Sequence, residues 1–222
     1  MFEVIAESFD KGGVLMYVIL LILILGLAIM VEKAIYLYHT ANANKEDFVK
    51  VLKKHLLAGN LQQAIKFSSA ATFPLAKIIH AGLLKAKESD NDVQAAMDEA
   101  ALKEIPRIEV RTPYLALIGN IAVLTGLLGA VVGLIRAFAA VAQADAASKA
   151  TELAKGIAEA MYNTAFGIGT AVLAVIVFAF LQAKTQQLED DINEATVSVL
   201  NLVTENRDKF FTSSDKRKNE EN

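Results

Sequence analysis

The chain has no cysteine and only three prolines and three histidines among its 222 residues. Without cysteine, neither a disulfide framework nor a thiolate metal site can form. The histidines are scattered, and no two stand at metal-ligand spacing on an expected helix, so we expect no metal site. So little proline, with so much alanine and leucine, predicts an almost entirely helical protein. The net charge of −3 gives no support for binding to nucleic acid.

Three long segments lack any charged residue: Gly12 to Val31, Thr112 to Ile135 and Ala160 to Ala183. Each is long enough to cross a bilayer, which takes about 20 apolar residues. The first is not typical of a signal peptide, because acidic residues precede it and no small-residue cleavage site follows. We therefore predict an all-α membrane protein whose three spans contact membrane lipids.

Lysine and arginine are unevenly distributed around these spans, which sets the expected orientation. The segment Glu32 to Arg111 holds twelve of them, against one before the first span and three between the second and the third. We expect the N-terminus outside and the C-terminus in the cytoplasm. In chain order, the expected parts are an outer segment 1–13, a span 14–38, a cytoplasmic helical loop 39–111, a span 112–141, a short periplasmic hairpin 142–157, a span 158–183, a cytoplasmic helix 184–211 and a disordered tail 212–222.

The cytoplasmic loop contains start and stop signals for four helices. In chain order, Gly59 is expected to end the first helix, Asn60 to cap the second, Pro74 to open the third, and Asp90 or Asn91 to cap the fourth. The fourth helix runs toward the second span through Pro106 and Pro113. Each proline removes a backbone donor, so a bend is expected there.

Small residues recur at helical spacing within the membrane. Gly126, Gly129 and Gly133 share a face of the second span, and Gly167 lies on a small-residue face of the third. In lipid, such faces let another helix approach closely. Beyond the third span, Leu188 to Leu202 carry a heptad-like apolar stripe. A lone three-helix protein has no evident use for these surfaces, so they predict assembly into a homo-oligomeric ring.

Polar side chains inside the spans form the candidate site. They are Asn120 and Thr125 in the second span, and Glu159, Asn163, Thr164 and Thr170 at or within the third. Polar groups in a bilayer are costly unless they face protein or water. Two interpretations stay open: the groups hold helices together, with each threonine bonded to its own helix, or they line an ion pathway.

The spans also lack something that an ion carrier needs. None has an Asp, Lys, Arg or His at its centre, where a self-sufficient proton pump would place one. If the protein conducts protons, the carrier must come from another polypeptide.

Several segments of the chain resemble the MotA/TolQ/ExbB proton-channel family. They are GGVLMYVILL with the later Val31-Glu32-Lys33, MDEAALKEIPRIE (Met97 to Glu109), IAVLTGLLGAVVGLIRAF (Ile121 to Phe138) and GIAEAMYNTAFGIGTAVLAV (Gly156 to Val175). The third is similar to the family pattern A-P-L-L-G-L-L-G-T-V-x-G-M. Each motif alone is weak, but their order and placement together are specific, and the short loop favours the ExbB/TolQ size class.

The resemblance implies a function. Such proteins form a ring, commonly a pentamer, in the bacterial inner membrane around two copies of a single-span partner of the ExbD/TolR/MotB kind. The partner's membrane Asp carries the proton, and the flow drives mechanical work on the envelope without a cofactor. Thr164 matches the family's pore-facing threonine, and Glu159 matches the glutamate five residues before it.

The chain also departs from the family pattern. Ala130 stands where the family has a second-span threonine, and Thr125, five residues earlier, is not a simple replacement. The change leaves open whether the cation is a proton or sodium.

Two other functions compete with that of a channel-forming stator subunit. A non-conducting membrane scaffold is the main alternative, and Ala130 is its support. A membrane enzyme is disfavoured, because the spans lack a nucleophile–base pair, a metal-ligand cluster and a phosphate-binding loop. The sequence does not name the process that would be energised.

Overall fold

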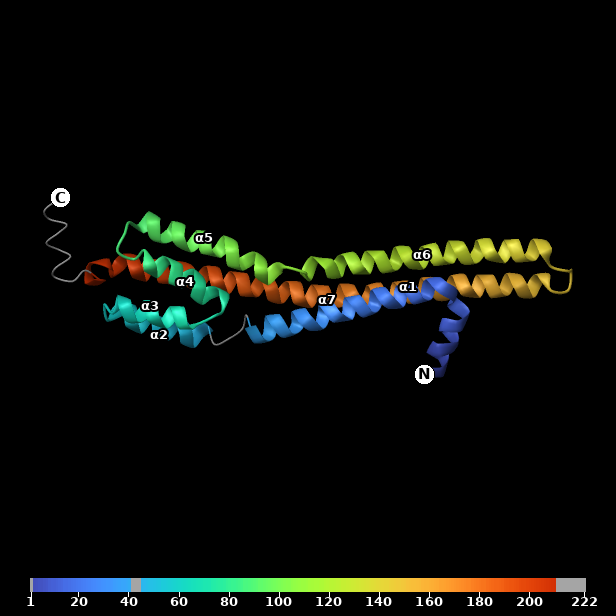
Figure 1. Ribbon diagram of the computed structural model, residues 1–222, viewed down its shortest axis with the longest axis horizontal. Coiled ribbons are helices and arrows are strands. Elements are labelled where there is room, and N and C mark those ends of the chain that lie inside the picture. The colour runs from blue at the N-terminus through green and yellow to red at the C-terminus, as the bar shows by residue number, and fades with distance from the viewer. Residues whose placement is uncertain (1, 41–44, 211–222) are drawn as a thin grey trace. The chain divides into compact units, whose positions relative to one another are not determined.

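All the regular structure in the described part of the chain is helical (Figure 1). The computed structural model describes residues 2–40 and 45–210. In chain order the elements are α1 (Phe2–Ile35), a π-helical turn (Tyr36–Thr40), α2 (Lys45–Leu57), α3 (Leu61–Ala70), α4 (Pro74–Leu84), α5 (Asp90–Glu109), α6 (Thr112–Gln143), α7 (Lys149–Glu205) and a 3-10 turn (Arg207–Phe210). The predicted tail 212–222 lies outside the described residues.

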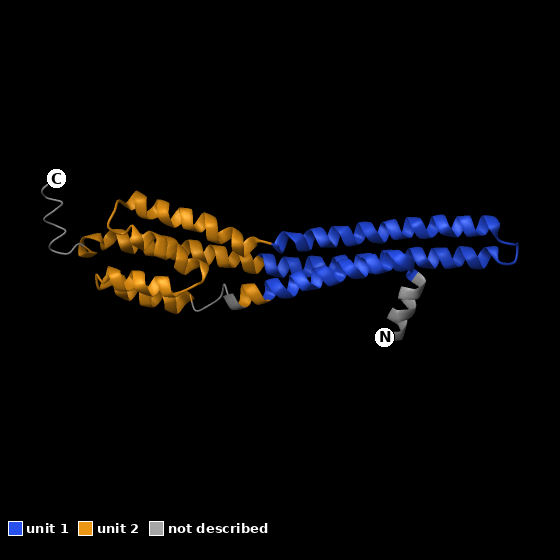
Figure 2. Ribbon diagram, viewed as in Figure 1, with its two compact units in different colours: residues 1–34, 111–182 blue, residues 35–110, 183–222 orange. Residues whose placement is uncertain are grey.

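The chain forms two compact units (Figure 2). The first, here the membrane unit, comprises Met1–Ala34 and Arg111–Gln182, and therefore most of α1, all of α6 and the first part of α7. The second, here the helical-loop unit, comprises Ile35–Val110 and Ala183–Asn222. Within residues 2–40 and 45–210, three helices are long and apolar enough to cross a membrane, which confirms the count of spans.

The helices extend well beyond the apolar segments that predict them. Helix α6 has 32 residues and α7 has 57. At about 1.5 Å per residue both exceed a hydrocarbon core of about 30 Å. Only residues 144–148 separate the two helices, so much of the segment 142–157 expected between the spans is helical. Hydropathy predicts where the membrane-spanning part ends. Alanine has a high helix propensity, so an alanine-rich sequence lets the helix continue beyond that point.

The helix that leads to the second span is interrupted between α5 and α6, at a position between the two prolines. Pro106 fits inside the last turn of α5, and Pro113 stands in the first turn of α6. The break falls at Arg111, whose φ of 72° is left-handed. The Arg111 guanidinium pairs with Glu32 of α1.

Helix starts in the helical-loop unit correct two predicted caps. Ser89, rather than Asp90 or Asn91, caps α5, in a reciprocal capping box with Asp92. Asn60 stands at the cap of α3 but its side chain makes no capping bond. Gly59 turns the chain there with φ 72°, as its stop signal predicts.

The apolar stripe of α7 is used within the chain. Helix α4 packs on α3 and α5, and α3 packs on α2. Leu188, Ile192 and Val199 of α7 are buried in the single chain. The inference that this stripe needs a second copy is therefore wrong, because intrachain packing already buries it.

Candidate functional site

The candidate site is built on a tight hairpin of α6 and the first part of α7. A Cβ placed on Gly126 would lie 2.9 Å from the Asn163 carbonyl oxygen and 3.2 Å from the Gly167 Cα. A Cβ on Gly167 would lie 2.7 Å from the Ala122 carbonyl oxygen. Only glycine permits two helix backbones to approach this closely.

The small-residue faces therefore meet each other inside one chain. Gly129 lies against the Asn163 side chain, and Gly133 lies against the backbone of Ala160. All four glycines singled out in the sequence are buried in this contact. The prediction that these faces require a neighbouring copy is wrong for the same reason as the α7 stripe, because packing within one chain already buries them.

Helix α1 covers one side of the hairpin. Gly26 of α1 approaches Ile118 of α6, since a Cβ there would lie 3.2 Å from the Ile118 Cγ2. Nearer the hairpin turn, the Asn163 Nδ2 donates to the Gly12 carbonyl oxygen over 2.8 Å. This side is called the α1 side below.

The α1 side holds three of the predicted polar residues of α7. Asn163 is 1% exposed and also donates to the Glu159 carbonyl oxygen over 3.0 Å. The Glu159 carboxylate pairs with the Arg136 guanidinium of α6 over 3.2 Å. Thr170 is buried seven residues beyond Asn163, and its hydroxyl has no hydrogen-bond partner among the described residues.

The opposite side of the hairpin is uncovered and carries a shallow hollow of about 310 Å³. Its lining residues are Ala130, Leu134, Ile157, Ala160, Met161 and Thr164. Thr164 is half-buried, and its hydroxyl donates to the Ala160 carbonyl oxygen of its own helix over 3.0 Å. The oxygen keeps acceptor capacity toward the hollow, because a hydroxyl has two lone pairs.

The two remaining predicted residues lie on different sides of α6. Thr125 follows Ile118 by seven residues, so it shares the α1 side, and its hydroxyl donates to the Ile121 carbonyl oxygen over 2.7 Å. Asn120 is exposed and follows Ile118 by two residues, which turns it about 200° away from α1. Thr125 therefore does not occupy the place of the missing threonine at Ala130, which lines the same hollow as Thr164.

The structure thus divides the six predicted residues into two groups. Glu159, Asn163, Thr170 and Thr125 lie on the α1 side, whereas Thr164 and Asn120 lie away from it. Sequence reasoning missed Arg136 as the partner of Glu159. The signal was available, because Arg136 directly follows the second apolar segment and Glu159 directly precedes the third, at the ends that the connection joins.

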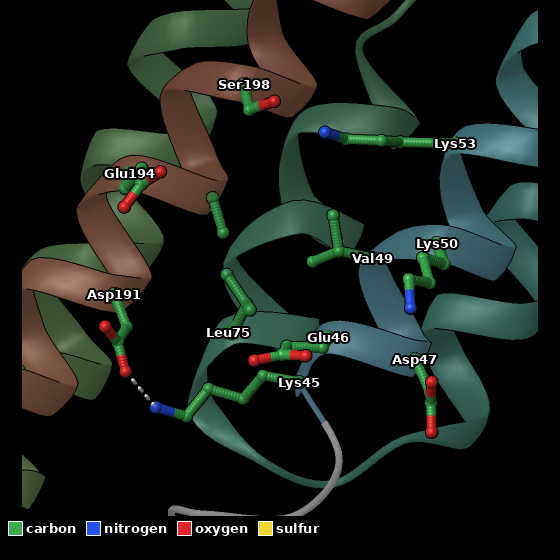
Figure 3. Close-up of a pocket in the computed structure, with 11 residues that line it drawn as sticks. Lys45, Glu46, Asp47, Val49, Lys50, Lys53, Leu75, Asp191, Glu194 and Ser198 are labelled. Atoms are coloured by element: carbon green, nitrogen blue, oxygen red, sulfur yellow. Dashed lines mark hydrogen bonds and ion pairs between the residues drawn. The ribbon is translucent and has the colours of Figure 1, made fainter.

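A second hollow, of about 610 Å³, lies in the helical-loop unit between α2, α4 and α7 (Figure 3). Lys45 of α2 pairs across it with Asp191 of α7 over 2.9 Å. Charges of both signs line it, including Lys53 and Glu194. In the described ranges no group of three or more His, Cys, Asp or Glu side chains is placed to hold a metal ion.

Comparison with known proteins agrees with the motifs noted in the sequence. A biopolymer transport protein ExbB homologue from Methanothermobacter thermautotrophicus is 25% identical over 87% of this chain and 67% of its own length. An ExbB-like biopolymer transport protein from Synechocystis is 29% identical over 89% of this chain and 78% of its own length. The Tol-Pal system protein TolQ of Pseudomonas aeruginosa is 36% identical, over 43% of this chain and 41% of its own length.

The family model of the MotA/TolQ/ExbB proton channels matches residues 70–194, which is more than half of the chain. The match includes α4, α5, the tight α6–α7 hairpin and the polar residues on both of its sides. This chain therefore belongs to the MotA/TolQ/ExbB proton channel family.

Proposed function

We propose that this chain is the channel-forming subunit of a proton-driven membrane motor, working in biopolymer transport or a Tol-Pal-like process. Copies of the chain form a ring, most simply a pentamer, in the bacterial inner membrane. The ring surrounds two copies of a single-span partner of the ExbD/TolR/MotB kind. The partner's membrane Asp carries the proton, and its outer part transmits the work.

The observation that carries this proposal is the uncovered side of the hairpin. Helix α1 closes one side of the α6–α7 pair, whereas the side with Thr164 is left open. A half-buried hydroxyl in a hollow otherwise lined by apolar side chains suits a partner group that is polar and embedded in the membrane. The three apolar segments supply no carboxylate of their own, which is why the carrier is assigned to the partner.

A proton-flux measurement tests the function. The chain is purified with its single-span partner, reconstituted in liposomes, and given a pH gradient. We expect proton entry that the partner's Asp→Asn variant abolishes, and a cellular process that stops when an uncoupler is added. Flux that is unchanged in the Asp→Asn variant would refute a carrier on the partner.

A non-conducting scaffold is the second candidate, because Ala130 puts no hydroxyl opposite Thr164 in the hollow. The same experiment separates the two functions. A scaffold gives no flux with either form of the partner and supports the cellular process in the presence of the uncoupler.

The orientation in the membrane yields a separate prediction. The chain has no native cysteine, so single cysteines report cleanly. Asn60 and Asp145 are both exposed, and we expect Asp145→Cys to react with an impermeant maleimide added outside, and Asn60→Cys to react only after permeabilisation. Labelling of Asn60→Cys in intact cells would overturn the proposed topology.

A further inference from the structure

Three helices meet beside the ion pair on the α1 side. Helix α1 is kinked at Gly13, whose φ is 69° and ψ is −166°. A Cβ on Gly13 would lie 2.6 Å from the Glu159 Oε1 and 3.8 Å from the Arg136 Nη1. The kink thus brings the α1 backbone against the ion pair, at a position whose left-handed backbone conformation favours glycine.

Asn163 secures the same kink from one helical turn away. A break in a helix leaves the carbonyls before it without intrahelical donors. The Asn163 Nδ2 supplies a donor to one of them, the Gly12 carbonyl oxygen. The other face of this side chain lies over Gly129 of α6. One buried amide thus contacts all three helices of the membrane unit.

The position of Glu159 on α7 separates it from the open side of the hairpin. Thr164 follows Glu159 by five positions along the helix, which corresponds to about 140° around its axis. The Glu159 side chain is 21% exposed, whereas the Arg136 side chain is 58% exposed. The Glu159 carboxylate therefore faces the kink of α1 and the Arg136 guanidinium, not the hollow that Thr164 lines.

We propose that Arg136, Glu159 and Asn163 form a clasp that holds α1 against the α6–α7 hairpin, with Arg136 as a positioning residue. In this clasp Glu159 acts as the fixed anion of an ion pair and does not carry the proton. The inference rests on the proposed function only where conduction is the readout. The clasp fixes the position of α1 on one side of the hairpin. The side with Thr164 is thereby left uncovered.

A charge swap tests the clasp. In the double variant Arg136→Glu with Glu159→Arg, the pair is restored with its charges exchanged. Arginine does not release its proton in proteins, so a carrier role at position 159 is lost in the swap. We expect each single variant to lower proton flux at least about tenfold, and the double variant to recover to within about threefold of wild type, the range of coupling that contacting charges show.

The control is an exposed ion pair on the same helix. Lys155 and Glu152 pair over 2.7 Å outside the apolar segment. Exchanging these two charges should leave flux and thermal stability unchanged, because exposed pairs contribute little. Arg136→Lys, which keeps the charge, should retain more flux than Arg136→Gln.

The outcomes separate the clasp from a carrier role. A folded double variant as inactive as Glu159→Gln, with Arg136→Lys and Arg136→Gln equally active, would overturn the clasp in favour of Glu159 as a carrier. The thermal unfolding midpoint of each variant in detergent gives a readout that needs no conduction. Coupling in that double-mutant cycle supports the clasp even if wild type conducts no protons, and additive midpoints count against it.

Discussion

Gly126→Leu is expected to prevent the α6–α7 hairpin from closing. The atoms nearest a side chain at Gly126 are the backbone of Asn163, Thr164 and Gly167, which cannot move out of the way as a flexible side chain can. A leucine there must push two helices apart along the whole contact. We expect a loss of more than about 3 kcal/mol in stability, at the severe end of overpacking effects.

The measurement is the thermal unfolding midpoint and the protease resistance of the purified chain in mild detergent. Gly169→Leu is the matched control, because it makes the same change on α7 where a Cβ would meet nothing within 4 Å. Gly129→Leu should fall between the two, since the atoms nearest Gly129 belong to the Asn163 side chain. A Gly126→Leu protein as stable as wild type would show that the helices do not approach as described.

Thr164→Val is expected to lower proton flux by at least about tenfold while the hairpin stays folded. Valine keeps the shape of threonine and removes only the hydroxyl, whose bond to the Ala160 carbonyl is replaceable within the helix. The folding cost should therefore be small, whereas the hollow loses its polar group. Flux is measured in liposomes with the partner present, at matched amounts of assembled protein.

Thr125→Val provides an internal control for this prediction. Thr125 makes the same kind of bond to its own helix, to the Ile121 carbonyl, but it lies on the α1 side of α6. We expect Thr125→Val to conduct as wild type does. Wild-type flux in both variants would show that the Thr164 hydroxyl only bonds its own helix. An equal loss of flux in both variants would assign the effect to helix stability.

These expectations depend on which side of a helix each residue faces, and the sequence supplied only part of that. Hydropathy located three spans and helix signals located the helices between them, because both depend on local composition. The four motif segments, taken together in their order, were sufficient to recognise the family. Helical periodicity also placed Glu159, Asn163 and Thr170 on a common face of α7.

The partner of each face was decided only by the tertiary structure. The small-residue faces of Gly126 and Gly167 fit equally well against another copy or against each other, and the fold chooses the second. Likewise, the stripe from Leu188 is buried by helices of its own chain. Periodicity gives the direction in which a side chain points from the axis of its helix, but not which neighbour lies on that side. For this reason the pairing of Arg136 with Glu159, the kink at Gly13 and the separation of Thr164 from Thr125 required the packed helices.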